Sequence, residues 1–303
     1  MVDWNSPNEL QNDATVGVRL IHVLAGVYFW EFVISLHFEW SYIRGTRKLH
    51  WPLIPYFLGR YSALGGLIGS VHWNVTVITS SHSSSCRRIN CQALMLFLSM
   101  CGSLMVGCST ATLALRTMAI WSMSWKCVVP LVVLILGHWA VLIQDVVVSG
   151  GEPIANDACV TTLGTSQQLM GTFIYSIGLD FIVMVLSAYK LLVQAHDFPR
   201  SRLVRLIFQD GLIYFIIVFL VNLPAAVVSS LDLNSIMNII FALPACVCSV
   251  IASGRAVRRL TRFAESSPPV HFIPTNPGHS AVVFRNVTVT SSVDDETRGE
   301  SLS

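Results

Sequence analysis

Six of the ionisable side chains inside the long apolar stretches of this sequence are candidates for a polar network, because a charge is expensive to place in hydrocarbon. They are Glu31, Arg60, His138, Asp145, Asp180 and Asp210. Because buried charges are usually paired, these groups could fix helices to one another, line a ligand pocket or form a polar path. Taken together, they predict a polar interior and leave its role open.

Glu31 and Arg60 would both lie within about two helical turns of the same membrane face, so the two side chains could pair. A second acidic residue, Glu39, follows just past the end of the first apolar stretch. We favour an ion pair that fixes two helices over a substrate site, because pairing is the usual fate of a buried charge.

His138 and Asp180 fall near the middle of their stretches. A His–Asp pair at that depth could be a polar latch or part of a ligand pocket. Asp145 would lie nearer the outer face, where it could line a pocket that opens outward. Asp210 would lie near the inner end of its stretch, either solvated or paired with a basic residue.

Motifs for metal or covalent chemistry are missing from the sequence. The eight cysteines include no C-x-x-C pair with zinc spacing, and the nine histidines are scattered. A Gly-x-Ser-x-Gly elbow and a His-Glu-x-x-His motif are also absent. We therefore expect no enzyme activity, metal or cofactor. The net charge of +2 gives no reason to expect nucleic acid as a partner.

Seven apolar stretches must position these side chains, each about the ~20 residues that a helix needs to cross a bilayer. They are Val16–Leu36, Leu53–Val75, Ala93–Leu115, Val128–Ser149, Leu169–Val193, Leu206–Ser229 and Ile236–Ala252. Only 12% of the residues are charged, against about 25% in a soluble domain. The expected fold is therefore an all-α bundle of seven transmembrane helices.

The basic residues between the stretches fall on alternate loops. Nearly all of them lie after the first, third, fifth and seventh stretches, whereas the opposite loops hold Arg87 and Arg88. Positive-inside bias then places the N-terminus outside and the C-terminus in the cytoplasm. The first stretch would be a retained signal anchor, since no basic n-region precedes it. The expected location is the plasma membrane or another membrane of the secretory pathway.

The composition divides the chain into four parts. They are a short extracellular N-terminus (1–15), the bundle (16–254), an amphipathic juxtamembrane helix (255–264) and a disordered cytoplasmic tail (265–303). In the third part, four arginines alternate with apolar residues at helical spacing, which suggests attraction to anionic lipid. A plain positive flank that only sets the orientation is the open alternative. The tail is predicted from its Ser, Pro and Gly content and its acidic patch.

Two cysteines and one arginine give a more specific pattern. Cys91 begins the third stretch and Cys159 lies in the loop after the fourth, both on the predicted outer side, where a disulfide could tie that loop to the bundle. Arg116 follows at the inner end of the third stretch. This arrangement resembles rhodopsin-like G-protein-coupled receptors, although Leu115-Arg116-Thr117 replaces their Asp/Glu-Arg-Tyr triplet. The resemblance implies coupling at the inner face through Arg116.

A second set of short motifs runs through the chain. It comprises Trp30-Glu31, Phe38-Glu39-Trp40, Trp51-Pro52, Arg60-Tyr61, Cys91-Gln92-Ala93, Leu115-Arg116, Ile120-Trp121 and Ser253-Gly254-Arg255. These motifs resemble a large family of integral membrane proteins from basidiomycete fungi, over about residues 16–259. The resemblance implies seven spans and an unknown function, and it brings no catalytic or binding residue.

The sequence leads to two competing functions. The first is receptor-like sensing of a small ligand, with Arg116 and a kink at Pro224 moving at the inner ends and contacting a cytoplasmic signalling partner. The second is a small-solute transporter or channel lined by buried charged groups. An odd number of spans does not divide into matched halves, which argues against a transporter. The lipid bilayer is a partner under both.

A glycine-rich segment, Gly65–Gly69, contains a G-x-x-x-G spacing that lets another helix approach closely. We favour a contact within the bundle over dimerisation, because a seven-helix bundle has many close internal contacts.

Overall fold

The computed structural model describes residues 7–45, 51–80, 91–154, 158–162, 166–197, 202–231 and 235–266. Side chains at several helix ends and throughout the hairpin lie outside the described set, including those at 73–80, 91, 150–169, 194–212 and 262–266. Most of the predicted tail, residues 267–303, also lies outside the described residues.

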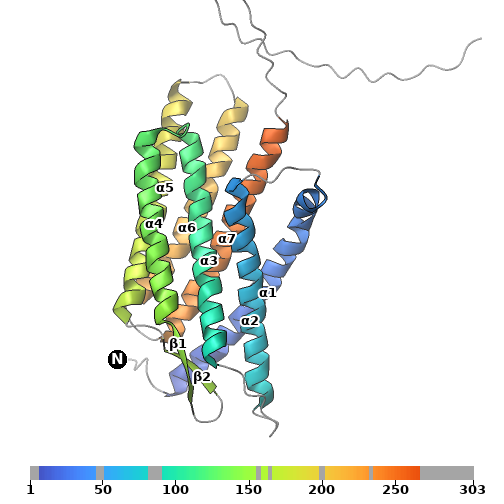
Figure 1. The fold of residues 1–303 in the computed structure, drawn as a ribbon, viewed down its shortest axis with the longest axis vertical. Coiled ribbons are helices and arrows are strands. Elements are labelled where there is room, and N and C mark those ends of the chain that lie inside the picture. Colours follow the sequence, from blue (N-terminus) through green and yellow to red (C-terminus); the bar gives the residue numbers. More distant parts are fainter. Residues whose placement is uncertain are drawn as a thin grey trace, which may run out of the picture. The chain divides into compact units, whose positions relative to one another are not determined.

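Seven long helices form the described part of the chain (Figure 1). They are α1 (Pro7–Ile43), α2 (Ile54–Ser80), α3 (Cys91–Ile120), α4 (Trp125–Val148), α5 (Ser166–Asp197), α6 (Arg202–Leu231) and α7 (Ser235–Ser266). A short 3-10 turn, Trp51–Leu53, precedes α2. Each predicted apolar stretch corresponds to one helix. Most helices are longer than their stretch, because backbone hydrogen bonding continues past the last apolar residue.

Six of the helices in the described residues are long and apolar enough to cross a membrane, and α2 is not among them. The described part of α2 carries Arg60 together with several glycines and serines, which lower its hydropathy. Large apolar side chains point outward, such as Val133, Leu136 and Ile143 of α4, which are 62%, 64% and 59% exposed. Such faces suit hydrocarbon rather than water. The prediction of a multi-pass membrane protein is supported, whereas the seventh span and the orientation remain predictions.

A small β-hairpin adds to the expected all-α fold. Strands β1 (Gly150–Ile154) and β2 (Ala158–Thr162) pair in antiparallel fashion between α4 and α5, with Cys159 opposite Pro153. The hairpin contacts α3. No disulfide is recorded among the described side chains, and those of Cys91 and Cys159 lie outside them. The bridge therefore stays a prediction, although the backbone brings the loop to α3.

Helices α2 and α3 approach each other closely because glycines of α2 face α3. A Cβ at Gly66 would lie 3.1 Å from the Cβ of Cys101, and one at Gly59 would lie 3.0 Å from the Cβ of Cys108. Both distances are tight for carbon atoms in contact. The glycine-rich segment therefore serves a contact within the chain, as expected.

The apolar core lies on both sides of α3. One cluster joins α3 to α4, α5 and α6 around Leu131 and Val183, and a second joins α1, α2 and α7 around Leu67 and Val247. A third cluster, which includes Phe38, packs α1 against α2 and α7. Each helix thus buries one face, as expected of a packed bundle.

The predicted boundary at residue 254 is wrong in one respect, because α7 continues without interruption from Ser235 to Ser266. Residues 255–264 are the end of α7 rather than a separate helix. Periodic apolar residues before and after Gly254 allow a single helix to continue, and Val257 is buried in the bundle. Similarly, Pro224 lies inside α6 and does not end it.

Candidate functional site

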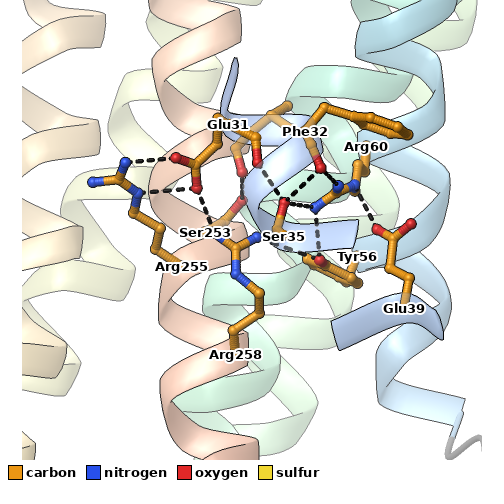
Figure 2. A network of polar contacts seen from close by, with 10 residues as sticks. Glu31, Phe32, Ser35, Glu39, Tyr56, Arg60, Ser253, Arg255 and Arg258 are labelled. Atoms are coloured by element: carbon orange, nitrogen blue, oxygen red, sulfur yellow. Dashed lines mark hydrogen bonds and ion pairs between the residues drawn. The ribbon is translucent and has the colours of Figure 1, made fainter. Parts of the chain in front are cut away.

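The side chain of Glu31 in α1 is held by two arginines of α7 (Figure 2). Arg255 donates to both carboxylate oxygens, from Nε at 3.0 Å and from Nη2 at 2.5 Å. Arg258 donates from Nη2 to Oε1 at 2.5 Å. These residues are three apart, so one face of α7 presents both guanidinium groups to a single carboxylate. Glu31 therefore fixes the end of α7 against α1.

Arg60 in α2 is the centre of the adjoining contacts (Figure 2). Its Nε lies 2.5 Å from Oε1 of Glu39, an ion pair that lacks the angles of a hydrogen bond. Its Nη1 donates to the hydroxyls of Ser35 at 2.5 Å and Tyr56 at 3.1 Å. Its Nη2 donates to the backbone oxygen of Phe32 at 2.7 Å. Glu39 is fully buried and Arg60 is 4% exposed, so this charge pair is held away from solvent.

We call the group Glu31, Glu39, Arg60, Arg255 and Arg258 the charge cluster. The possible Glu31–Arg60 pair is wrong in its partners, because Arg60 pairs with Glu39 and Glu31 pairs with α7. Both glutamates lie on α1, eight residues apart, and the rotation of α1 turns one towards α2 and the other towards α7. Sequence position gives the depth of each group and not the direction in which it points.

Arg116 of α3 lies beside the charge cluster and contacts the same helix. Its Nη2 donates to the backbone oxygen of Ala256 at 2.7 Å, next to Arg255 in α7. Its Nη1 is buried without a hydrogen-bond partner among the described residues. Arg116 thus joins α3 to the end of α7 and is engaged inside the bundle.

A second group, which we call the Asp180 network, lies between α3, α5, α6 and α7. Thr110 donates to Oδ1 of Asp180 at 3.2 Å, and Asn222 donates from Nδ2 to Oδ2 at 2.8 Å. Ser249 donates to Oδ1 of Asn222 at 3.4 Å. Among the described residues, Thr110 and Asn222 bind the buried carboxylate of Asp180, and both are neutral. Four helices therefore meet at one acidic group.

His138 does not meet Asp180, so the proposed His–Asp pair is wrong. Its Nε2 lies 2.8 Å from the hydroxyl of Ser176, one turn before Asp180 in α5. Its ring stacks on Tyr175 with 5.8 Å between centroids. The Tyr175 hydroxyl donates to the backbone oxygen of Leu134 at 2.9 Å. His138 is 1% exposed and joins α4 to α5.

Of the other two acidic candidates, only Asp145 has a described side chain, and it lies apart from these groups. Asp145 is half-buried near the end of α4 and accepts a hydrogen bond from Thr172 of α5. Asp210 lies in α6. The structure thus separates the five described groups into several sites rather than one network or path, and the side chain of Asp210 lies outside the described residues.

A small cavity adjoins the charge cluster between α1, α2, α3 and α7. It is lined by Glu31, Tyr56, Arg60, Ser109 and Arg258, among others. Its volume is about 20 Å³, and one water needs about 10–15 Å³. It is therefore a water-sized space in this conformation. No group of three metal-ligating side chains occurs in the described part of the chain.

The sequence pattern does not reveal the roles of Glu39, Arg255 and Arg258. It predicts the two arginines in a juxtamembrane helix at the membrane surface, and their spacing of three residues does not by itself point to Glu31. The useful signal is that Val257 between them is apolar, which indicates that the same face continues into the bundle.

Comparison with protein-family models and with curated proteins found no match to this chain. The resemblance to fungal membrane proteins and to receptors therefore stays a prediction.

Proposed function

We propose that the protein is a receptor-like membrane protein of seven spans, in which a small ligand bound on the outer side releases the end of α7. The observation that carries this proposal is the double attachment of that end. Glu31 holds Arg255 and Arg258, while Arg116 holds the backbone of Ala256. All of these contacts fall on one segment of α7, residues 255–258.

The attachment has the form of a switch, because charge pairs between helices can exchange partners when the helices move. If Glu31 releases α7, Arg116 loses its acceptor at Ala256 and becomes available to a partner. The positive-inside rule puts this end in the cytoplasm, where a signalling protein would bind. Arg116 therefore keeps the coupling role that its position predicts, in the released state.

The alternative is a small-solute transporter or channel. Its proposed lining groups, Asp180, His138, Glu31 and Arg60, each bind different partners in the described structure. The cavity at the charge cluster has room for water only. These observations favour the receptor over the transporter.

The test uses the full chain in lipid nanodiscs with Glu31→Gln, which weakens the attachment, and Arg44→Gln as a matched control. Arg44 is exposed and contacts the ring of Trp40 at the end of α1. We expect Glu31→Gln to co-purify with heterotrimeric G protein in a complex that a GTP analogue dissociates. Adding Arg116→Ala should abolish the complex.

A complex that is absent from every variant, together with solute flux in proteoliposomes, would favour the transporter. A complex that Arg116→Ala leaves unchanged would remove Arg116 from the coupling role while leaving the rest of the proposal in place.

A further inference from the structure

The arginines of α7 exceed the acid that holds them. Arg255 and Arg258 share the one carboxylate of Glu31, while Glu39 is occupied by Arg60. The charge cluster thus holds three arginines and two glutamates, which leaves one positive charge in excess. Arg116 adds another beside it, bound to a neutral carbonyl oxygen.

The excess positive charge is partly exposed to the surroundings of the bundle. The side chain of Arg255 is 55% exposed, whereas that of Arg258 is 12% exposed. Arg258 also lies near the Tyr56 hydroxyl, with Nη1 at 3.4 Å. Arg255 can therefore meet a ligand from outside the bundle, and Arg258 lies behind it at the wall of the cavity.

The carboxylate of Glu31 shows what such a ligand would look like. Its two oxygens accept three charge-assisted hydrogen bonds from two guanidinium groups (Figure 2). A phosphate monoester is tetrahedral but also offers pairs of oxygens on one central atom, carries more negative charge and is bound by arginine in a bidentate way. The site is therefore built for an oxyanion.

We infer that Arg255 and Arg258 form a binding site for the phosphorylated headgroup of an anionic membrane lipid, for which Glu31 is the internal competitor. The lipid is favoured as the source because α7 is apolar enough to cross a membrane and Leu260, two residues after Arg258, is an exposed apolar side chain. Anionic lipids also gather at the membrane face that basic residues mark as cytoplasmic. This site is separate from the outer ligand site of the proposed receptor and does not depend on it.

The experiment measures binding of a fluorescent short-chain phosphatidylinositol bisphosphate to the full purified chain by anisotropy. Glu31→Gln removes the competing charge, so we expect affinity to rise about fivefold, the effect of one unit charge near a membrane surface. Arg255→Gln leaves Glu31 paired with Arg258 and should lower affinity about fivefold. The rise distinguishes this site from a purely structural ion pair, since weakening the fold would not tighten binding.

Arg44→Gln is the matched control, because it removes one positive charge from the same end of the bundle. Unchanged affinity in Glu31→Gln, or an equal loss in Arg44→Gln and Arg255→Gln, would overturn the inference. If Glu31→Gln fails to fold, Arg255→Gln against Arg44→Gln still decides the matter. The soluble headgroup and inorganic phosphate serve as competitors. Competition equal to that of the lipid would show that the ligand is a soluble phosphate and would overturn the assignment to lipid.

Discussion

The charge cluster and the Asp180 network both supply partners for buried carboxylates, but the partners are charged in the first and neutral in the second. In the charge cluster, each glutamate meets guanidinium groups, and the two glutamates lie on one helix. In the Asp180 network, one carboxylate meets an amide and a hydroxyl from other helices. Opposite charges hold α1, α2 and α7 together, whereas hydrogen bonds from neutral donors join α3, α5, α6 and α7 around Asp180.

The two regions differ in the free energy that is lost when one contact is broken. A hydrogen bond between side chains inside a membrane contributes about 0.6 kcal/mol on average. The hydrogen bonds of the Asp180 network can therefore be lost one at a time at small cost. A buried ion pair resists removal of one partner by about 3–5 kcal/mol, because the other charge is left unpaired. This cost would separate the two states of the exchange of partners that we propose for the charge cluster.

The largest expected effect is at the Arg60–Glu39 pair. Glu39→Ala leaves the Arg60 guanidinium buried without its acid, so we expect a loss of about 3–5 kcal/mol in the free energy of unfolding. Unfolding in mixed detergent micelles measures it. Combining Glu39→Ala with Arg60→Met should recover part of that loss, since no unpaired charge then remains. A double variant less stable than Glu39→Ala alone would show that the pair is not the source of the effect.

Glu31→Ala should cost less, about 1–3 kcal/mol, because the half-exposed Arg255 can turn to solvent. Hydrogen exchange in nanodiscs should become faster over residues 255–266 of α7, while the hairpin end of the bundle keeps its protection. Uniformly faster exchange over all helices would instead show that Glu31 supports the whole fold.

Asp180→Asn is expected to cost about 1 kcal/mol. The amide can keep its bond from Thr110, whereas its nitrogen faces the amide of Asn222 unless that group turns over. Thermal unfolding of the detergent-solubilised chain measures the loss. Thr110→Val is the companion variant, because valine has nearly the size of threonine and lacks only the hydroxyl that donates to Asp180. A loss at Asp180→Asn as large as that at Glu39→Ala would remove the distinction between the two regions.

The smallest effect should come from Ser249→Ala. Its hydroxyl lies 3.4 Å from the Asn222 oxygen, at the limit of hydrogen bonding. We expect a change in the free energy of unfolding below about 0.5 kcal/mol. A larger loss in the same unfolding assay would indicate that Ser249 supports the Asp180 network more strongly than the distance suggests.

The seven helices were predictable from the sequence, because helix length and apolar content follow from bilayer thickness. The pairings were not. His138 and Asp180 were expected to meet because they have similar depth, yet His138 faces Ser176 one turn away. Glu31 binds residues more than two hundred positions away, a contact that depends on which helix lies beside α1. Depth can be read from a single sequence, whereas neighbours and rotation are set by packing.

The boundary at residue 254 failed for a related reason. Basic residues after an apolar stretch are typical of a membrane edge, so the sequence predicts that the bundle ends at residue 254 and that a separate amphipathic helix follows over 255–264. Buried acid at Glu31 makes the next turn of α7 favourable inside the bundle, because it supplies the partner that Arg255 and Arg258 need. The hairpin between α4 and α5 carried no comparable signal in the apolar pattern.

The close approach of α2 to α3 has a mechanical consequence. The Cβ atoms of Cys108 and Cys101 in α3 leave almost no space at Gly59 and Gly66 of α2, so these two helices cannot slide past each other without a steric collision. We therefore expect α2 and α3 to move together as one arm of the bundle. Arg60 is carried on one half of this arm and Arg116 on the other. A tilt of the arm would displace both arginines together, so α1 and α7 would respond to a single movement.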